Sequence, residues 1–159
     1  MTQKKKDKVN ILFVCHGNIC RSPMAEFVMK HLVHEAGLAD KISVTSKALH
    51  RDEIGSDTHR GTREILRARG IPFSKRQAAL MTAADYDAYD CIIGMDTENM
   101  DDLARLTGGD PRGKVRRLLS YIGEERDVAD PWYTGNFEAT YRDVDAGCRA
   151  LLKDLTKSA

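Results

Sequence analysis

The apolar segment Val9–Cys15 is the feature that most constrains the fold, because only Asn10 interrupts it. A continuous apolar run of this length, ended by Gly17 and Asn18, is typical of a strand that is buried on both faces of a parallel sheet. Neighbouring parallel strands need crossover connections, and these are usually helices. The segment therefore predicts an α/β fold, in which sites lie at the carboxyl ends of the strands.

A helix is predicted immediately after this strand. Ser22 is suited to the N-cap, Pro23 to the first helical position, and Gly37 to the residue just beyond the end. Between Pro23 and Gly37, apolar residues recur at helical spacing. Strand and helix together predict one unit of an alternating α/β fold.

The same alternation continues along the chain. Further strands are predicted at residues 41–45, 90–94 and 114–119, and further helices at residues 58–69, 96–106 and 137–155. At 159 residues, the chain has the size of one domain. We expect this domain to span residues 9–157, preceded by a flexible basic tail at residues 1–8.

The composition excludes several classes of protein. The 25 basic and 24 acidic side chains give a net charge of +1, so no strong positive field is available to bind nucleic acid. The longest apolar run near the start, Ile11–Cys15, is far shorter than the roughly 20 residues that span a bilayer. Four cysteines are too few for a disulfide framework. We therefore expect a soluble, cytoplasmic protein that binds neither nucleic acid nor a membrane.

The segment between the predicted strand and the predicted helix is suited to binding a compact anion. A loop in this position directs free backbone N–H groups and the positive end of the helix dipole at one point. Gly17 and Asn18 allow unusual backbone conformations that curl the amides inward. We expect inorganic phosphate or a similar oxyanion to be held by a loop that contains His16, Gly17, Asn18, Ile19, Cys20 and Ser22.

Cys15 and Arg21 flank this loop and predict its chemistry. The helix dipole and the guanidinium favour negative charge on the Cys15 sulfur, so we expect a nucleophilic thiolate at neutral pH. The planar fork of Arg21 matches two oxygens of a phosphate group. The Ser22 hydroxyl is placed to donate to the sulfur and make it a better leaving group.

The spacing of Cys15 and Arg21 is by itself a weak signal. Such a pair arises often by chance, and a buried cysteine followed by a solvated arginine is the simpler interpretation. The surrounding frame favours the functional interpretation, since an apolar strand precedes the loop and a helix start follows it. A nucleotide-binding phosphate loop is excluded because no Gly-Lys-Ser/Thr sequence follows.

The segment Ile11–Glu26, with the sequence ILFVCHGNICRSPMAE, closely resembles the signature of low-molecular-weight protein tyrosine phosphatases. The segments Ile93–Asp96, Gly108–Pro111 and Asp127–Gly135 are similar to later blocks of that family and follow its order. The resemblance implies a four-stranded parallel sheet with helices on both faces. It also implies hydrolysis of phosphotyrosine in proteins through a cysteinyl-phosphate intermediate on Cys15, without a metal or other cofactor.

The resemblance assigns the general acid/base to Asp130. An aspartate before Pro131 has a restricted, extended backbone, which suits a carboxyl group held over a cleft. From the residues alone a turn aspartate is the simpler interpretation, and only the family pattern predicts that Asp130 meets Cys15. Trp132 and Tyr133 are expected to wall the substrate cleft, although Trp132 replaces a tyrosine that is common in the family.

The chain departs from the family pattern after the second strand, where many relatives have Ser-Ala-Gly-Thr followed by an aromatic residue. Here Ser46 begins the sequence SKALH, so we place Leu49 in the cleft wall and expect Ser46 to support Asn18. The family histidine that helps to fix the loop is replaced near Arg76. The rest of the support for Asn18 is therefore left open.

The sequence leaves three alternative functions to that of a phosphotyrosine phosphatase. In this family, isoleucine at the position of Ile19 accompanies a preference for phosphotyrosine, whereas threonine accompanies phosphoarginine phosphatases. An arsenate reductase on the same fold needs further cysteines after the third strand, but Cys91 lies within that strand and the next cysteine is Cys148. A non-catalytic anion-binding module would lack the nucleophile, the arginine or the acid, and all three are present.

Other histidines and cysteines carry smaller expectations. His50 and His59 have no Cys or His at metal-ligand spacing, so we interpret both as solvated loop residues. The curled loop is expected to bring Cys20 close to Cys15, where it can capture an oxidised Cys15 as a disulfide. The sequence makes no prediction of the oligomeric state.

Overall fold

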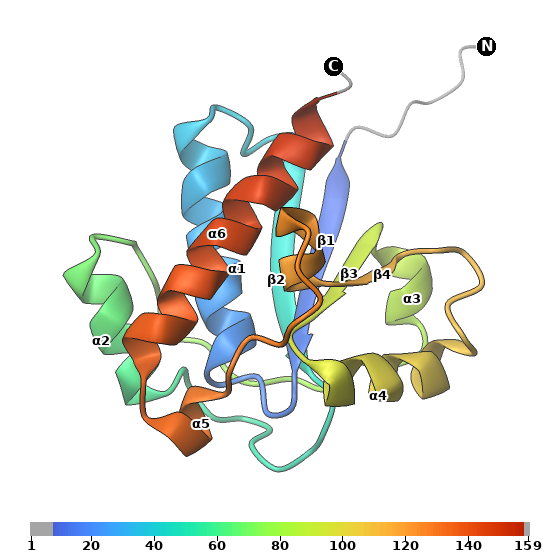
Figure 1. Ribbon diagram of the computed structural model, residues 1–159, viewed down its shortest axis with the longest axis horizontal. Helices are drawn as coiled ribbons and strands as arrows, with labels where there is room; N and C mark the ends of the chain where they lie inside the picture. Colours follow the sequence, from blue (N-terminus) through green and yellow to red (C-terminus); the bar gives the residue numbers. More distant parts are fainter. Residues whose placement is uncertain (1–7, 158–159) are drawn as a thin grey trace.

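The computed structural model describes residues 8–157, so the predicted tail lies outside the described residues except for Lys8. Four strands form one parallel sheet in the order β2-β1-β3-β4 (Figure 1). The strands are β1 (Val9–Cys15), β2 (Ile42–Ala48), β3 (Cys91–Gly94) and β4 (Val115–Arg117). The predicted α/β class and the four-stranded parallel sheet are confirmed.

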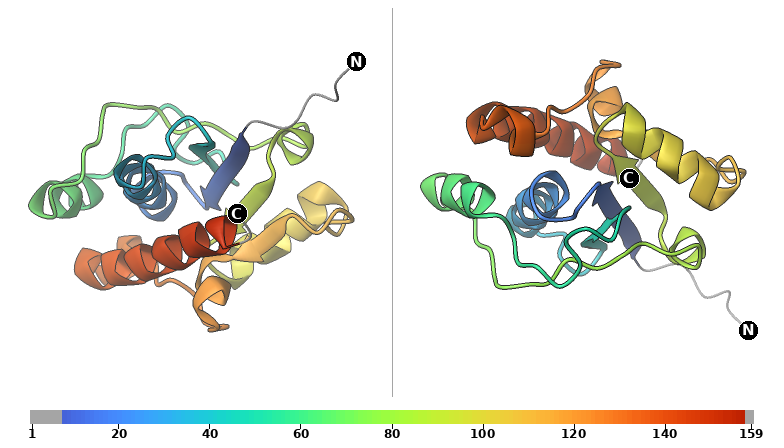
Figure 2. Two further views of the ribbon diagram at one scale, coloured as in Figure 1. Left: turned by 90° about the horizontal axis from the view of Figure 1, so that it is seen from above. Right: turned by 90° about the horizontal axis from the view of Figure 1, so that it is seen from below.

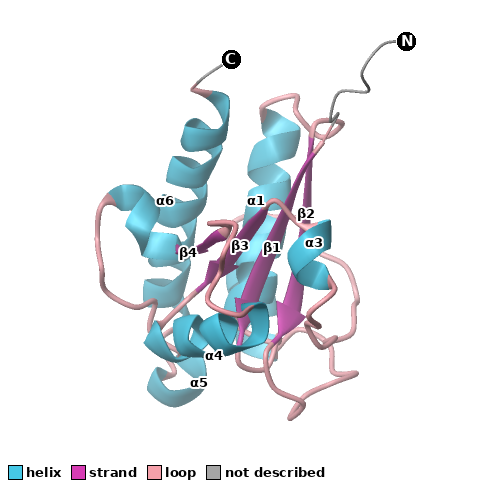
Figure 3. Cartoon of the chain, turned by 90° about the vertical axis from the view of Figure 1, so that its right-hand side faces the viewer, coloured by secondary structure: helices cyan, strands magenta, loops and turns pink. Residues whose placement is uncertain are grey.

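Helices cover both faces of this sheet. They are α1 (Arg21–Glu35), α2 (Arg60–Ala68), α3 (Asp85–Ala88), α4 (Thr97–Thr107), α5 (Pro131–Thr134) and α6 (Phe137–Thr156), with a 3₁₀ helix η1 at Leu118–Ile122. Figures 2 and 3 show α1 and α6 on one side of the sheet and α3 and α4 on the other. Among the described residues, no helix is both long and apolar enough to cross a membrane.

The central strand β1 divides the core into two clusters. Ile11 and Phe13 pack with the residues of α1 and α6, whereas Leu12 and Val14 pack with Tyr86 of α3 and with α4. All four β1 side chains are fully buried, and each contributes about 1.5–3 kcal/mol relative to an exposed position. The continuous apolar run in the sequence thus reflects a strand covered on both faces.

Two strands differ in length from the prediction. β2 continues to Ala48 instead of ending at residue 45, because it pairs with β1 along its whole length. β4 ends at Arg117, and the predicted continuation to residue 119 is wrong. Leu118 and Leu119 instead begin η1, and both are fully buried in the core cluster that contains residues of α1 and α6. The short helices α3 and α5 were not predicted.

The start of α1 also differs from the prediction. The helix begins at Arg21 with Cys20 at the N-cap and no side-chain cap, so Ser22 is not the N-cap and Pro23 is the third helical residue. The Ser22 hydroxyl is engaged by the sulfur of Cys15 and the amide of Asn18 instead. Proline is tolerated at Pro23 because the first four N–H groups of a helix have no partner within it.

Candidate active site

The loop between β1 and α1 surrounds the sulfur of Cys15, whose side chain is only 3% exposed. Cys15 Sγ lies 3.1 Å from Ser22 Oγ and 3.4 Å from the backbone N of Ser22, which donates to it. Ser22 Oγ accepts a hydrogen bond from Asn18 Nδ2 at 2.8 Å, so its own hydrogen is free to point at the sulfur. These donors and the helix N-terminus all stabilise negative charge on Cys15.

Asn18 makes the sharp bend of the loop. Its φ of 60° places it in the left-handed region, whereas Gly17 has no positive φ. The expectation that Gly17 supplies an unusual backbone conformation is therefore wrong. A Cβ atom at Gly17 would lie 3.4 Å from Cγ of Glu53, an ordinary van der Waals contact, so the neighbouring loop does not require glycine here.

Hydrogen bonds between the Asn18 side chain and neighbouring residues hold Asn18 in this conformation. Besides Ser22, the buried Asn18 amide donates to Ser46 Oγ at 2.9 Å. Ser46 Oγ in turn donates to Glu26 Oε1 at 2.6 Å. The structure thus places Ser46 of β2 beside Asn18 and continues the chain of bonds to Glu26 of α1.

Arg76 donates hydrogen bonds to both oxygen atoms of Asn18. Arg76 Nη1 donates to the Asn18 carbonyl oxygen at 3.0 Å, and Arg76 Nη2 donates to Asn18 Oδ1. The backbone N of Ala79 also donates to Oδ1 at 3.2 Å. Burial lowers the pKa of Arg76, against the opposing charges of Glu26 and Asp57. The support that the sequence left open is therefore an arginine that reaches in from the loop after α2.

Arg21 lies next to the nucleophile, with only 2% of its side chain exposed. Nη1 donates to Asp96 Oδ2 at 2.7 Å and to the carbonyl oxygen of Val128 at 3.0 Å. Burial opposes its charge, but the negative charges of Cys15, Asp130 and Asp96 outweigh burial and raise the pKa of Arg21. Nε is buried and has no hydrogen-bond partner among the described residues. An oxyanion in the loop would satisfy this donor.

Asp130 also lies beside Arg21, although it is far from the loop in sequence. Its Oδ2 accepts from Arg21 Nη2 at 3.3 Å, and its Oδ1 accepts from the backbone N of Trp132 at 3.0 Å. Asp130 is the N-cap of α5, with an extended backbone (φ −84°, ψ 112°) before Pro131. The proline and the cap bond fix the direction in which the carboxyl group points.

Cys15, Arg21 and Asp130 share one cleft of about 150 Å³. The further lining residues are His16, Gly17, Ile19, Cys20, Asp52, Glu53, Glu98, Trp132 and Tyr133. Trp132 and Tyr133 are 55% and 83% exposed, so aromatic surface stands at the mouth of the cleft. Leu49 is absent from the lining, contrary to the expectation, and packs against the core cluster of Leu12.

Sequence reasoning missed Asp96, which orients Arg21. Asp96 caps α4, because its Oδ1 accepts from the backbone N of Asn99 at 2.7 Å while Oδ2 accepts from Arg21. An aspartate followed by a helical segment is a recognisable N-cap signal. That signal predicts a helix start, but the contact with Arg21 depends on the packing of β3 beside β1.

The interpretation of His50 and His59 as solvated loop residues is wrong. His50 Nε2 lies 2.8 Å from Asp102 Oδ2, and the ring stacks on His16 with centroids 4.1 Å apart. His59 accepts from the backbone N of Gly61 as the cap of α2 and stacks on Phe137. Both rings are partly buried and have specific partners.

Comparisons with known proteins identify the family of the whole chain. A family model described as "Low molecular weight phosphotyrosine protein phosphatase" matches residues 10–159. The low molecular weight protein-tyrosine-phosphatase YfkJ of Bacillus subtilis is 42% identical over 151 residues, which are 94% of this chain and 97% of YfkJ.

Two solved structures extend the comparison. The crystal structure of YfkJ from Bacillus subtilis is similar with a TM-score of 0.93 and 40% identity, over 98% of this chain and 99% of that one. The crystal structure of DARP, a Drosophila arginine phosphatase, is similar with a TM-score of 0.84 and 30% identity. That likeness covers 92% of this chain and 97% of DARP.

Proposed function

The chain belongs to the low molecular weight phosphotyrosine protein phosphatase family, and we propose that Cys15, Arg21 and Asp130 carry its phosphatase activity. One observation supports this most strongly. Cys15 and Arg21 at the two ends of one loop share a cleft with the distant Asp130, and the buried Nε of Arg21 there has no partner among the described residues. A thiol, a phosphate-binding fork and a carboxyl group at one point provide all the groups that two-step phosphate transfer requires.

In the first step, the Cys15 thiolate attacks phosphorus. The sulfur–phosphorus bond forms, and the bond between phosphorus and the tyrosine oxygen breaks. Asp130, in its protonated form, gives its proton to that departing oxygen. Arg21 and the loop amides bind the phosphoryl oxygens and stabilise the charge that develops on them.

In the second step, water attacks the phosphorus of the cysteinyl phosphate. Asp130, now a carboxylate, takes a proton from this water, and the sulfur leaves as a thiolate. The Ser22 hydroxyl, 3.1 Å from Cys15 Sγ, stabilises the departing sulfur. Inorganic phosphate is released and the enzyme returns to its starting state.

The cleft favours phosphotyrosine in protein substrates. Trp132 and Tyr133 at the mouth provide apolar surface for an aryl ring, and Ile19 lines the wall with a branched apolar side chain. Phosphoserine and phosphothreonine are too short to carry phosphorus to Cys15 at the bottom of the cleft. A guanidinium would find no polar partner on Ile19.

Phosphoarginine remains the second candidate substrate, because the similar DARP is an arginine phosphatase. Arsenate reduction is less well supported. The register pairs Cys91 with Ile11, four residues before Cys15, so Cys91 lies roughly 13 Å from the level of Cys15 along the sheet. Cys148 is fully buried in α6. The cytoplasmic location expected from the sequence stays a prediction.

Hydrolysis of a small aryl phosphate tests the assignment. The purified protein should be active with a chelator present, and Cys15→Ser and Arg21→Ala should leave essentially no activity. Cys91→Ser and Arg60→Ala are the matched controls, because neither residue lines the cleft, and both should keep full activity. Near-normal turnover by Cys15→Ser would refute the proposal.

A further inference from the structure

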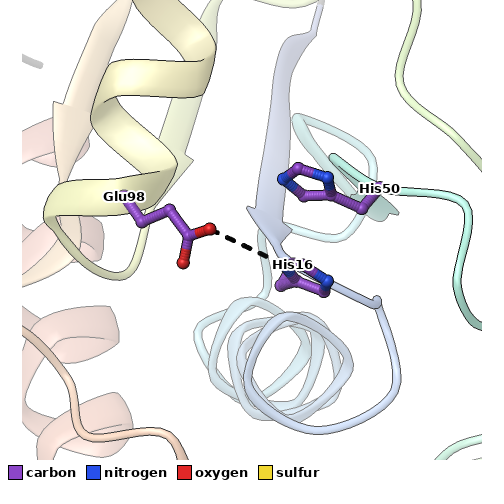
Figure 4. A group of neighbouring side chains, drawn as sticks. All are labelled: His16, His50 and Glu98. Carbon is purple, nitrogen blue, oxygen red and sulfur yellow. Dashed lines mark ion pairs between the residues drawn. The ribbon is translucent and has the colours of Figure 1, made fainter.

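His16, His50 and Glu98 form a cluster at the edge of the cleft (Figure 4). They come from three separate segments: the loop after β1, the loop after β2, and the first turn of α4. One ligand atom from each lies within 4.8 Å of the other two, and His16 Nδ1 is 4.0 Å from Glu98 Oε2. Two imidazoles and a carboxylate in such proximity are a common donor set for a transition metal.

The hydrogen bonds of His16 prepare it as a ligand. His16 Nε2 lies 2.6 Å from Asp52 Oδ2. If Nε2 carries the proton that Asp52 accepts, the lone pair of His16 is on Nδ1, the nitrogen that faces Glu98. A carboxylate that holds the far nitrogen of a histidine is the usual second partner of metal-binding histidines.

Acidic groups surround the two imidazoles. Asp102 lies one helical turn after Glu98 on α4, and its Oδ2 is 2.8 Å from His50 Nε2. The other oxygen of Asp102 pairs with the exposed Arg105. Asp52, Glu98 and Asp102 thus place three carboxyl groups around two rings. This excess of negative charge favours a divalent cation beside the two rings.

We propose that His16, His50 and Glu98 bind a divalent transition metal, with Zn²⁺ as the best match, and that binding reversibly inhibits the enzyme. Donor atoms around tetrahedral zinc are roughly 3.3 Å apart, and a nitrogen lone pair lies in the plane of its ring, so the two stacked rings must turn toward the ion and the cluster must contract. The exposed, flexible Glu98 side chain allows this contraction. Glu98 and His16 both line the cleft, so an ion that ties them together narrows the entry for substrate.

Calorimetric titration of Zn²⁺ tests the binding site without relying on phosphatase activity. The titration uses the Cys15→Ser protein, in which the thiolate cannot act as a ligand, so its result is independent of the proposed function. We expect one Zn²⁺ per chain. Adding His50→Gln should lower the Zn²⁺ affinity by at least about 10-fold. His34→Gln, an exposed histidine of α1, is the matched control and should not change the affinity.

Inhibition is measured on the protein with Cys15 intact. His50 does not line the cleft, so His50→Gln should keep the basal activity but need about 10-fold more Zn²⁺ for half inhibition. A chelator should restore the activity of the inhibited enzyme. Glu98→Gln gives a second test of weaker binding if His50→Gln fails to fold.

Three outcomes would overturn the proposal. Equal Zn²⁺ affinity with and without His50 would show that the ion binds elsewhere. The absence of any Zn²⁺ binding to the Cys15→Ser protein would show that His16, His50 and Glu98 do not form a metal site. Replacement of Zn²⁺ by Co²⁺ gives an independent readout of the ligands. A nitrogen and oxygen donor set gives no thiolate-to-metal charge-transfer band, so such a band would assign the ion to Cys15 instead.

Discussion

Arg76 donates hydrogen bonds to both the carbonyl oxygen and the side-chain oxygen of Asn18, a residue 58 positions earlier in the chain. Asn18 is the residue whose left-handed backbone bends the loop around Cys15. The arginine therefore fixes the shape of the phosphate-binding loop from outside the cleft. It is a positioning residue, because it acts on the reaction through Asn18.

Replacement of Arg76 should loosen the loop without removing a catalytic group. We expect Arg76→Met to lower kcat/KM by roughly 10- to 100-fold, since small displacements of reacting groups have effects of this size. Inhibition by inorganic phosphate should weaken in parallel, and Arg76→Lys should restore part of both. Arg60→Met, an exposed arginine that pairs with Glu64, is the control. Unchanged phosphate inhibition in Arg76→Met would show that the loop does not depend on this contact.

Removal of the acid should have an effect that depends on the leaving group. General acid catalysis contributes about 10²–10⁴-fold, and it matters most when the leaving oxygen is basic. Asp130→Ala should therefore slow phosphotyrosine cleavage far more than cleavage of an activated nitrophenyl ester. Asp127→Ala, three residues earlier and outside the cleft, should slow neither strongly. Equally small effects on both substrates would mean that Asp130 is not the acid.

Cys20 should capture oxidised Cys15, and the capture should be faster at higher pH. Burial and, next, the negative charge of Cys15 raise the pKa of the Cys20 thiol to about 12. Peroxide first converts the Cys15 thiolate to a sulfenic acid. Cys20 then attacks this sulfur, a disulfide forms and water leaves. Below its pKa, the thiolate fraction of Cys20 grows about tenfold with each pH unit, so disulfide formation should accelerate between pH 7 and 9.

Mass spectrometry after mild peroxide treatment detects this disulfide. A reductant should restore the activity of the wild type and of Cys91→Ser, but Cys20→Ser should be inactivated permanently. The absence of a crosslink between Cys15 and Cys20 would contradict the prediction.

Ile19 should set the preference between phosphotyrosine and phosphoarginine. Its apolar side chain lines the cleft, is only 9% exposed, and packs with Ala78 and Phe137. Ile19→Thr provides a hydroxyl for a guanidinium nitrogen, so the ratio of kcat/KM values should shift toward phosphoarginine. Ile54→Thr, an exposed isoleucine outside the cleft, should leave the ratio unchanged. Equal wild-type efficiency on both substrates would show that Ile19 does not decide the choice.

The sequence by itself determined the framework of this protein. The apolar run Val9–Cys15 predicted a strand covered on both faces, and the alternation of strands and helices predicted the parallel sheet. The pattern from Cys15 to Arg21 predicted an anion-binding loop with a nucleophile, because these features depend on neighbours in the chain. Local sequence also predicted the extended backbone of Asp130 before proline.

Tertiary structure decided which distant side chains complete the site. Arg76, Asp96 and Asp130 reach the loop from segments far away in sequence, and the order of the strands, not any local pattern, brings them there. The same reason explains the errors. The spacing of Ser22 predicts a helix cap, whereas packing of the loop directs its hydroxyl to Cys15. Local sequence predicts a solvated His50, because its partners, His16 and Asp102, lie on other segments.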